Sequence, residues 1–310
     1  MNILNIAIYF SVLLFLITVF SKIIKIIKAP LHLRWELYPV PHEKGKAHYG
    51  GSRLEEVDWW TKPMQHDVLG DWKIMLPEII FLKAVWEHNK SLWWGTFPFH
   101  FALYMLFTNV VLCIIAALMN LGGNTVLNQT GGFDTLMYWL IQYIVWVGSA
   151  LGVLGAVKLF SSRLFVPGLR KFSAASHYFN IILIGGIYLT AFIWSVTDIS
   201  FMNNLIGIYT GLITLNSIPE LPFIAYLDVW LIVLFLAYLP FTHMTHFFVK
   251  YFTYHKIRWE DSPNVSGSKM QAEISSLLNQ PVSWSAPHIG ADGRKTWVAI
   301  ASAAPEKIKK

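Results

Sequence analysis

Five stretches of the chain are almost continuously apolar over about 20 residues or more, the length of helix that crosses roughly 30 Å of hydrocarbon. They cover residues 3–27, 97–121, 134–160, 177–199 and 221–249. No internal repeat relates them, which argues against the paired halves common in transporters. The pattern therefore predicts an all-α membrane bundle of five transmembrane helices.

The Lys and Arg residues are distributed very unequally between the connections. Eleven lie between Lys22 and Lys90, four between Lys158 and Lys171, and nine between Lys250 and Lys310. The connections near 122–133 and 200–220 contain none. Because basic residues accumulate on the cytoplasmic side of membrane proteins, the N-terminus is expected outside. The first and third loops and the C-terminal tail are then cytoplasmic.

The composition supports a membrane protein. The 310 residues are 55% hydrophobic and 14% charged, whereas soluble domains are about 25% charged. The first apolar run ends in "SKIIKIIK" with no small-residue cleavage site, which favours a retained span over a signal peptide. The net charge is +6. The position of the basic residues in the loops is explained by the membrane orientation, so no nucleic-acid partner is predicted. The single cysteine, Cys113, excludes a disulfide framework and a thiolate set for zinc or an iron–sulfur cluster.

Two domains are expected: a membrane domain over residues 1–260, which includes a cytoplasmic loop at 30–95, and a cytoplasmic tail at 261–310. Both cytoplasmic pieces are rich in tryptophan, which is typical of membrane interfaces and of protein contacts. In the tail, "SGSKMQAEISSLLNQ" predicts a short helix. The segment 201–218 is moderately apolar with several polar residues, and we expect it to lie along the outer surface.

Small residues occur where neighbouring spans could approach closely, and plain helix packing is their favoured interpretation. They are Gly148, Gly152, Gly155, Gly185 and Gly186.

Four of the eleven histidines lie within the predicted spans, at a similar depth near the cytoplasmic face. They are His100, His177, His243 and His246. Ionisable residues inside a membrane are rare and commonly functional, although one histidine alone could simply bond a backbone carbonyl. Two at matching depth on different helices indicate a shared ligand. Haem iron takes an imidazole on each axial side, so a b-type haem between the second and fifth helices is predicted. Zinc would require more closely clustered ligands.

Asp228 is an intramembrane carboxylate about two turns into the fifth predicted helix. Two interpretations stay open for it. It could exchange a proton with a quinol, or its side chain could reach the outer interface.

Three stretches resemble the gamma subunit of respiratory nitrate reductase and its relatives. "FPFHFALYMLF" is similar to the start of that family's second helix, "KLFSSRLFVPGLRKFSAAS" to its third inner loop and "LPFTHMTHFFVKYFTYHKIRW" to its last helix. The resemblance covers about residues 1–260. The loop "HLRWELYPVPHEKGKAHYGGSRLEEVDWW" and the tail "PVSWSAPHIGADGRKTW" look more like the cytochrome b subunits of sulfate reducers, especially in the complex that contains type II cytochrome c3.

The resemblance implies axial haem ligands at His100 and His246. His243 then takes the place of an alternate ligand or of a partner to a haem propionate or a quinone. His177 stays unassigned, and one alternative pairs it with His243 to hold a second haem. The family's outer haem would need ligands at the positions of Val110 and Asp228, and neither side chain is a plausible iron ligand.

The sequence thus predicts an inner-membrane cytochrome b subunit of a quinone-linked oxidoreductase complex, with no complete active site of its own. It would move electrons between menaquinone and a cytoplasmic iron–sulfur subunit of the heterodisulfide reductase type. A periplasmic multihaem cytochrome c would meet the outer face. One haem b per chain is expected, with two as the alternative. Two other functions are weighed against this one: a haem-free membrane anchor for a soluble redox enzyme, and a proton or solute carrier that uses histidine and Asp228.

Overall fold

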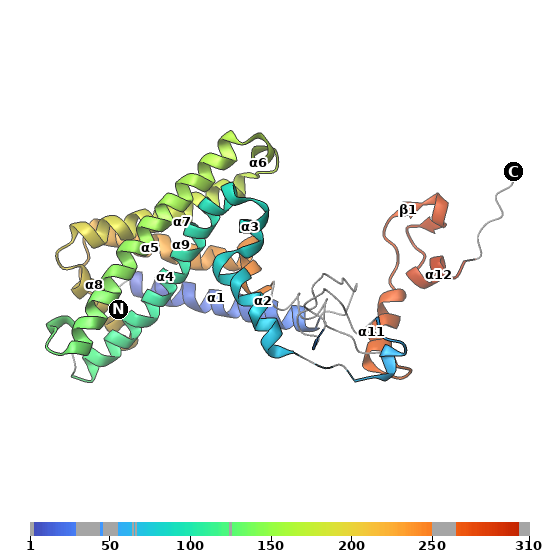
Figure 1. Cartoon of the computed structure of the whole chain (residues 1–310), viewed down its shortest axis with the longest axis horizontal. Coiled ribbons are helices and arrows are strands. Elements are labelled where there is room, and N and C mark those ends of the chain that lie inside the picture. Colours follow the sequence, from blue (N-terminus) through green and yellow to red (C-terminus); the bar gives the residue numbers. More distant parts are fainter. Residues whose placement is uncertain are drawn as a thin grey trace. The chain divides into compact units, whose positions relative to one another are not determined.

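The structure is a computed structural model of the whole chain. It describes residues 3–28, 44–45, 55–63, 65, 67–123, 126–249 and 265–303. The described part is almost entirely helical, as the apolar pattern predicts (Figure 1). The only strands in it are two short ones near the C-terminus.

The α-helices are α1 (Ile3–Lys28), α2 (Val68–Phe81), α3 (Lys83–His88), α4 (Lys90–Leu121), α5 (Gly132–Phe165), α6 (Pro167–Lys171), α7 (Ala175–Thr197), α8 (Phe201–Ile213), α9 (Phe223–Tyr238), α11 (Lys269–Leu278) and α12 (Trp297–Ala301). The strands are β1 (Ser285–Ala286) and β2 (Ala291–Asp292). Short 3-10 turns are η3 (Trp59–Thr61), η4 (Val126–Asn128), η5 (Leu239–Phe241), η6 (His243–Thr245) and η7 (Pro287–Ile289).

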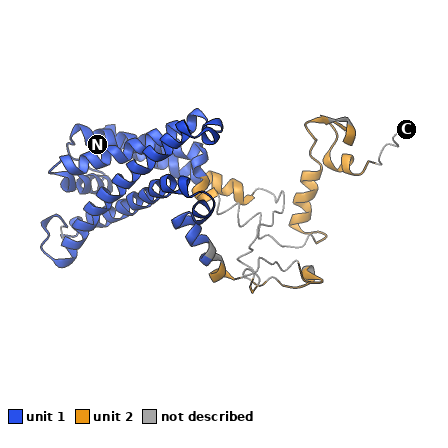
Figure 2. Ribbon diagram, turned by 45° about the horizontal axis from the view of Figure 1, so that its top comes forward, with its two compact units in different colours: residues 1–20, 72–245 blue, residues 21–71, 246–310 orange. Residues whose placement is uncertain are grey.

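The chain forms two compact units (Figure 2). The first comprises residues 1–20 and 72–245, and the second comprises residues 21–71 and 246–310. The predicted domain boundary at residue 260 lies outside the described residues and stays a prediction.

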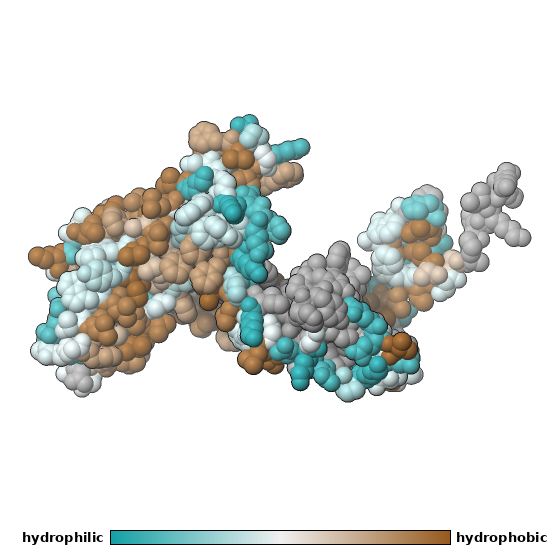
Figure 3. Space-filling view, in the orientation of Figure 1, coloured by the Kyte–Doolittle hydropathy of each residue, from teal (hydrophilic) through white to brown (hydrophobic). Residues whose placement is uncertain are grey.

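Five described helices are long and apolar enough to cross a membrane, which confirms the predicted number. They are Ile3–Lys28, Lys90–Leu121, Gly132–Phe165, Ala175–Thr197 and Phe223–Phe241. Apolar side chains also cover much of the visible surface of the first unit (Figure 3). Phe107, Leu154 and Ile182, for example, are exposed large hydrophobic residues. Because such a surface would be unstable in water, the chain is a multi-pass membrane protein.

In the first unit, α5 packs against both α4 and α7, and α7 packs against α9. Two predicted glycines make this closeness feasible. A Cβ on Gly155 would lie 2.6 Å from the backbone nitrogen of Phe99, and one on Gly152 would overlap the Tyr188 ring. Tyr188 in turn donates a buried hydrogen bond to the Phe99 carbonyl oxygen at 2.7 Å. The interpretation of these glycines as packing positions is therefore confirmed.

The second span begins earlier than the sequence predicted, at Lys90 rather than at residue 97. Asn89 explains the start, because its side-chain oxygen accepts a hydrogen bond from the backbone N–H of Leu92 at 3.0 Å. Such a cap satisfies one of the unpaired N–H groups of the first helical turn. Residues 90–95, expected in the cytoplasmic loop, belong to α4.

The fifth span differs from the expected continuous helix over 221–249. Helix α9 ends at Tyr238, and the chain continues through the 3-10 turns η5 and η6 before helical conformation resumes at His246. Pro240 causes the break, because proline has no N–H to donate and its ring clashes with the carbonyl four residues earlier. His243 and His246, which the sequence analysis places in one continuous span, are therefore separated by the end of the turn η6.

The segment expected along the outer surface contributes to the core, and its place at the outer surface stays a prediction. Helix α8 packs against α4 and buries Phe201, Met202 and Ile206. The N-terminal part of α1 is bonded to the end of this segment: Tyr9 donates a hydrogen bond to the Leu212 carbonyl at 2.7 Å, and Asn5 donates one to the Asn216 carbonyl at 3.0 Å. Two backbone carbonyls of the segment thus join it to α1.

In the second unit, the predicted tail helix is confirmed as α11. Ser268 caps it by accepting a hydrogen bond from the backbone N–H of Gln271 at 3.1 Å. The following strands β1 and β2 pair antiparallel. Trp284 and Trp297 meet edge to face there, with ring centroids 6.3 Å apart.

Candidate functional site

His100 lies on α4 and is half-buried. Its Nδ1 is 2.8 Å from the Thr96 carbonyl oxygen, one turn earlier in the helix. Because a carbonyl oxygen can only accept, Nδ1 must carry the hydrogen, and Nε2 of the neutral ring then carries the lone pair. A backbone bond of this kind orients histidines that ligate metals and raises their basicity. His100 is thus held in the tautomer that a metal ligand needs.

His177 lies in the first turn of α7 and has the opposite arrangement. Its Nδ1 accepts a hydrogen bond from the backbone N–H of Ala174 at 3.0 Å. In the neutral ring the hydrogen is then on Nε2, which makes that atom a donor rather than a metal ligand. The side chain satisfies one of the N–H groups that a helix start leaves unpaired.

His177 and His243 are brought together. Their rings meet edge to face, with centroids 5.2 Å apart and an interplanar angle of 80°. His243 is in the turn η6, where Thr242 orders the backbone by accepting a hydrogen bond from the Met244 N–H at 3.1 Å. The break after α9 thus places an imidazole next to the start of α7.

The neighbours of these histidines share one apolar cluster. Phe99, Ile181 and Tyr188 are buried in it, and Met244 packs against it. Phe99 precedes His100 and Met244 follows His243, so three of the four predicted histidines border the same part of the first unit. The contact between His177 and His243 brings two of the predicted histidines together, and the similar depth of all four in the membrane stays a prediction.

His246 belongs to the second unit and begins a helical turn that is described as far as Val249. Its side chain is exposed. Its pairing with His100 stays a prediction of the sequence.

Asp228 lies on α9 and is only 4% exposed. Its Oδ1 accepts a hydrogen bond from the Thr190 hydroxyl on α7 at 2.6 Å. The carboxyl group therefore does not extend to the surface, which was one of its two interpretations, but joins two helices inside the bundle. Val110, the other position at which an outer haem would need a ligand, is a partly exposed apolar residue on α4.

Asn180 is a buried polar residue that the sequence analysis did not single out. Its Oδ1 accepts a hydrogen bond from the Tyr238 hydroxyl at 3.0 Å, whereas its Nδ2 is buried with no partner among the described residues. It lies three residues after His177, hence on nearly the same face of α7. Its position in an apolar span, one turn from a histidine, was the available signal.

Among the described residues, no group of three or more His, Cys, Asp and Glu side chains could hold a metal ion. A haem makes a smaller demand, because the porphyrin supplies four of the iron's ligands and the protein supplies the axial ones. The donor set of the first unit, an oriented imidazole in an apolar setting, fits that demand.

Comparisons with known proteins identify no relative. No protein-family model matches the chain, and neither the characterised proteins nor the solved structures contain a match.

Proposed function

We propose that this chain is a membrane cytochrome b subunit of a respiratory electron-transfer complex, similar to the gamma subunit of nitrate reductase. It would move electrons between menaquinone and a cytoplasmic iron–sulfur subunit, and would reside in the cytoplasmic membrane. The proposal adds a b-type haem to the multi-pass membrane protein described above.

The hydrogen bond between His100 and Thr96 carries this proposal. It fixes the imidazole on helix α4 in the tautomer whose Nε2 carries the lone pair, which is the form that ligates iron. His246 is the proposed second axial ligand, as the sequence predicted. When bound, haem supplies one-electron chemistry, and the protein supplies orientation and electrostatics.

The other residues of the first unit have supporting roles in this proposal. The contact with His177 orients His243, whose imidazole would interact with a haem propionate or a quinone oxygen. Asp228, as the carboxylate, would accept a proton that quinol oxidation releases, because burial favours the neutral carboxyl that this uptake forms. Asn180 offers an amide donor that would suit a quinone carbonyl oxygen.

Reduction by a quinol tests the proposal. The full chain is purified in detergent, and menadiol, a soluble menaquinol analogue, is added under anaerobic conditions. We expect the absorption bands of a reduced b-type haem to develop. Haem that dithionite reduces but menadiol does not would contradict the role of quinol, and a protein without haem would support the haem-free anchor.

The soluble partner is proposed to dock on the loop at 30–95 and on the tail at 261–310. Deletion of the tail after Trp259 tests this contact. We expect the iron–sulfur subunit to be lost from the purified complex while the membrane domain keeps its haem. Unchanged co-purification would contradict docking on the tail.

A further inference from the structure

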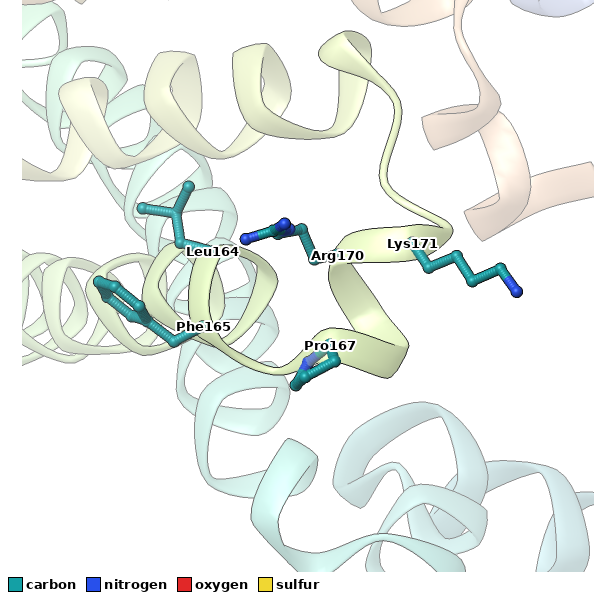
Figure 4. Close-up of a pocket in the computed structure, with 5 residues that line it drawn as sticks. All are labelled: Leu164, Phe165, Pro167, Arg170 and Lys171. Atoms are coloured by element: carbon teal, nitrogen blue, oxygen red, sulfur yellow. The ribbon is translucent and has the colours of Figure 1, made fainter.

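The corner between α5 and α6 contains an open cavity of about 380 Å³. Its lining combines two basic side chains, Arg170 and Lys171, with Leu164, Phe165 and Pro167 (Figure 4). Its volume lies at the lower end of the roughly 300–1,000 Å³ that is typical of small-ligand sites. The lining chemistry therefore suits a molecule with an anionic group attached to apolar chains.

The charge of this corner is uncompensated. Lys158, Arg163, Arg170 and Lys171 occur here, and no acidic residue is present between Asp134 and Asp198. Elsewhere in the described ranges, Lys62, Lys83 and Lys269 form ion pairs with glutamates, whereas the four basic residues of the corner form none. Within residues 135–197, an anion that binds here would therefore meet no competing carboxylate.

Internal hydrogen bonds give the corner a defined shape. Arg163 donates to the Ser173 hydroxyl at 3.0 Å, and Ser173 donates to the Leu169 carbonyl at 2.7 Å. The Tyr178 hydroxyl donates to the Arg163 carbonyl at 2.9 Å, which ties the start of α7 to the end of α5. Arg163 thus braces the turn, and Arg170 and Lys171 line the cavity.

The surroundings favour a lipid over a soluble anion. Phe165 is 79% exposed and Phe172 is 76% exposed, on either side of the basic pair. The Lys171 ammonium lies over the Phe172 ring, 5.8 Å from its centroid. Aromatic and basic residues at the end of a spanning helix are typical of the membrane interface, where basic groups contact lipid phosphates.

We infer that this corner binds an anionic phospholipid. Arg170 contacts its phosphate group, and Leu164 and Phe165 contact the first part of its acyl chains. Lys171, whose side chain extends away from Arg170 in Figure 4, adds positive charge at the same turn. In Figure 4, Arg170 extends back towards Leu164 on α5, so a phosphate held by its guanidinium lies next to apolar side chains. The site concerns lipid recognition and does not depend on the haem.

Binding of phosphatidylglycerol to the full-length, delipidated protein tests this inference, with phosphatidylcholine as the neutral lipid. Arg170→Gln/Lys171→Gln removes two charges, and we expect it to weaken phosphatidylglycerol binding about 30-fold, since each basic residue near an anionic surface contributes roughly fivefold. Lys83→Gln/Lys269→Gln removes the same charge elsewhere and should leave binding unchanged. The exchange Arg170→Lys/Lys171→Arg keeps the charge and should retain most of the affinity.

Three results would overturn the inference. One is equal affinity of the wild-type chain for phosphatidylglycerol and phosphatidylcholine. Another is an equal loss of phosphatidylglycerol binding in the two double glutamine variants. The third is that inorganic phosphate alone displaces the lipid at comparable concentration, which would indicate a site for a soluble anion.

Discussion

The rings of His177 and His243 are in direct contact, with their centroids 5.2 Å apart. Two imidazoles on opposite sides of one metal ion place their centroids about 6 Å apart, because each metal–nitrogen bond is about 2 Å, with the porphyrin plane between them. The observed contact is shorter and edge to face. The geometry therefore favours a histidine pair at this position over a second haem.

We accordingly predict that His177→Ala leaves the haem content unchanged at one per chain. The substitution removes the acceptor for the Ala174 N–H, at a cost of about 1 kcal/mol in stability. Haem per polypeptide, measured as the pyridine complex, checks this. Two haems in the wild-type protein and one in the variant would instead establish the His177 and His243 pair as ligands.

Asp228→Asn should keep the helix contact and impair proton exchange. The amide oxygen can still accept from Thr190, so the stability should change by no more than about 0.6 kcal/mol, the average for interhelical hydrogen bonds in membranes. Menadiol-driven haem reduction should slow about 100-fold if the carboxyl acts as the general base. Stopped-flow absorption measures this rate.

Thr190→Val is the matched control for Asp228→Asn. It removes the hydrogen bond that Asp228→Asn keeps, while it leaves the carboxyl group in place, so reduction should remain near the wild-type rate. A wild-type rate of haem reduction in Asp228→Asn would contradict a role of the carboxyl group in quinol oxidation.

Gly152→Ala should destabilise the bundle by about 1–3 kcal/mol, the usual cost of overpacking. The added methyl group would overlap the Tyr188 ring, whose hydroxyl bonds the Phe99 carbonyl next to His100. Gly132→Ala is the control, because its Cβ would meet nothing within 4 Å. Thermal unfolding of both variants in detergent compares them, and equal midpoints would contradict the close packing of α5 and α7.

We predict that Asp198 makes the junction between α7 and α8 less stable in acid. Desolvation alone would raise its pKa, but hydrogen bonds from Trp194, Asn204 and Ser200 outweigh it and lower the pKa of the carboxyl. A carboxyl with a lowered pKa stabilises the fold at neutral pH, and this contribution disappears as the pH falls through its folded-state pKa.

Asp198→Asn should therefore lower the unfolding midpoint at neutral pH and weaken its decline in acid. Unfolding midpoints measured from neutral pH down to pH values below the carboxyl's ordinary pKa check this. Parallel curves for the wild-type protein and the variant would contradict the assignment.

The sequence predicted the spans well because hydropathy over a membrane's thickness is a property of the segment alone. The predicted bounds were wrong at two places where a single residue determines where a helix starts or ends. The cap at Asn89 starts α4 earlier, and Pro240 divides the last span. Pro240 is present in the sequence, but it lies in a long apolar run, so the break in the helix was not predicted.

The site was predictable only in part. Sequence spacing predicts that the histidines lie at one level, because each span has an expected direction and a known rise per residue. Their tautomers could not be predicted, because these depend on which carbonyl or N–H each ring meets. The bond between Asp228 and Thr190 links residues 38 positions apart and requires a particular rotation of two helices.

The central claim is the haem held by His100, and a dithionite-reduced minus oxidised spectrum tests it most directly. It should be recorded with haem quantified per polypeptide, on the wild-type protein, His100→Ala and His246→Ala. We predict one b-type haem in the wild-type chain and its loss in both variants. A wild-type chain without haem, or full haem content in His100→Ala, would contradict the account.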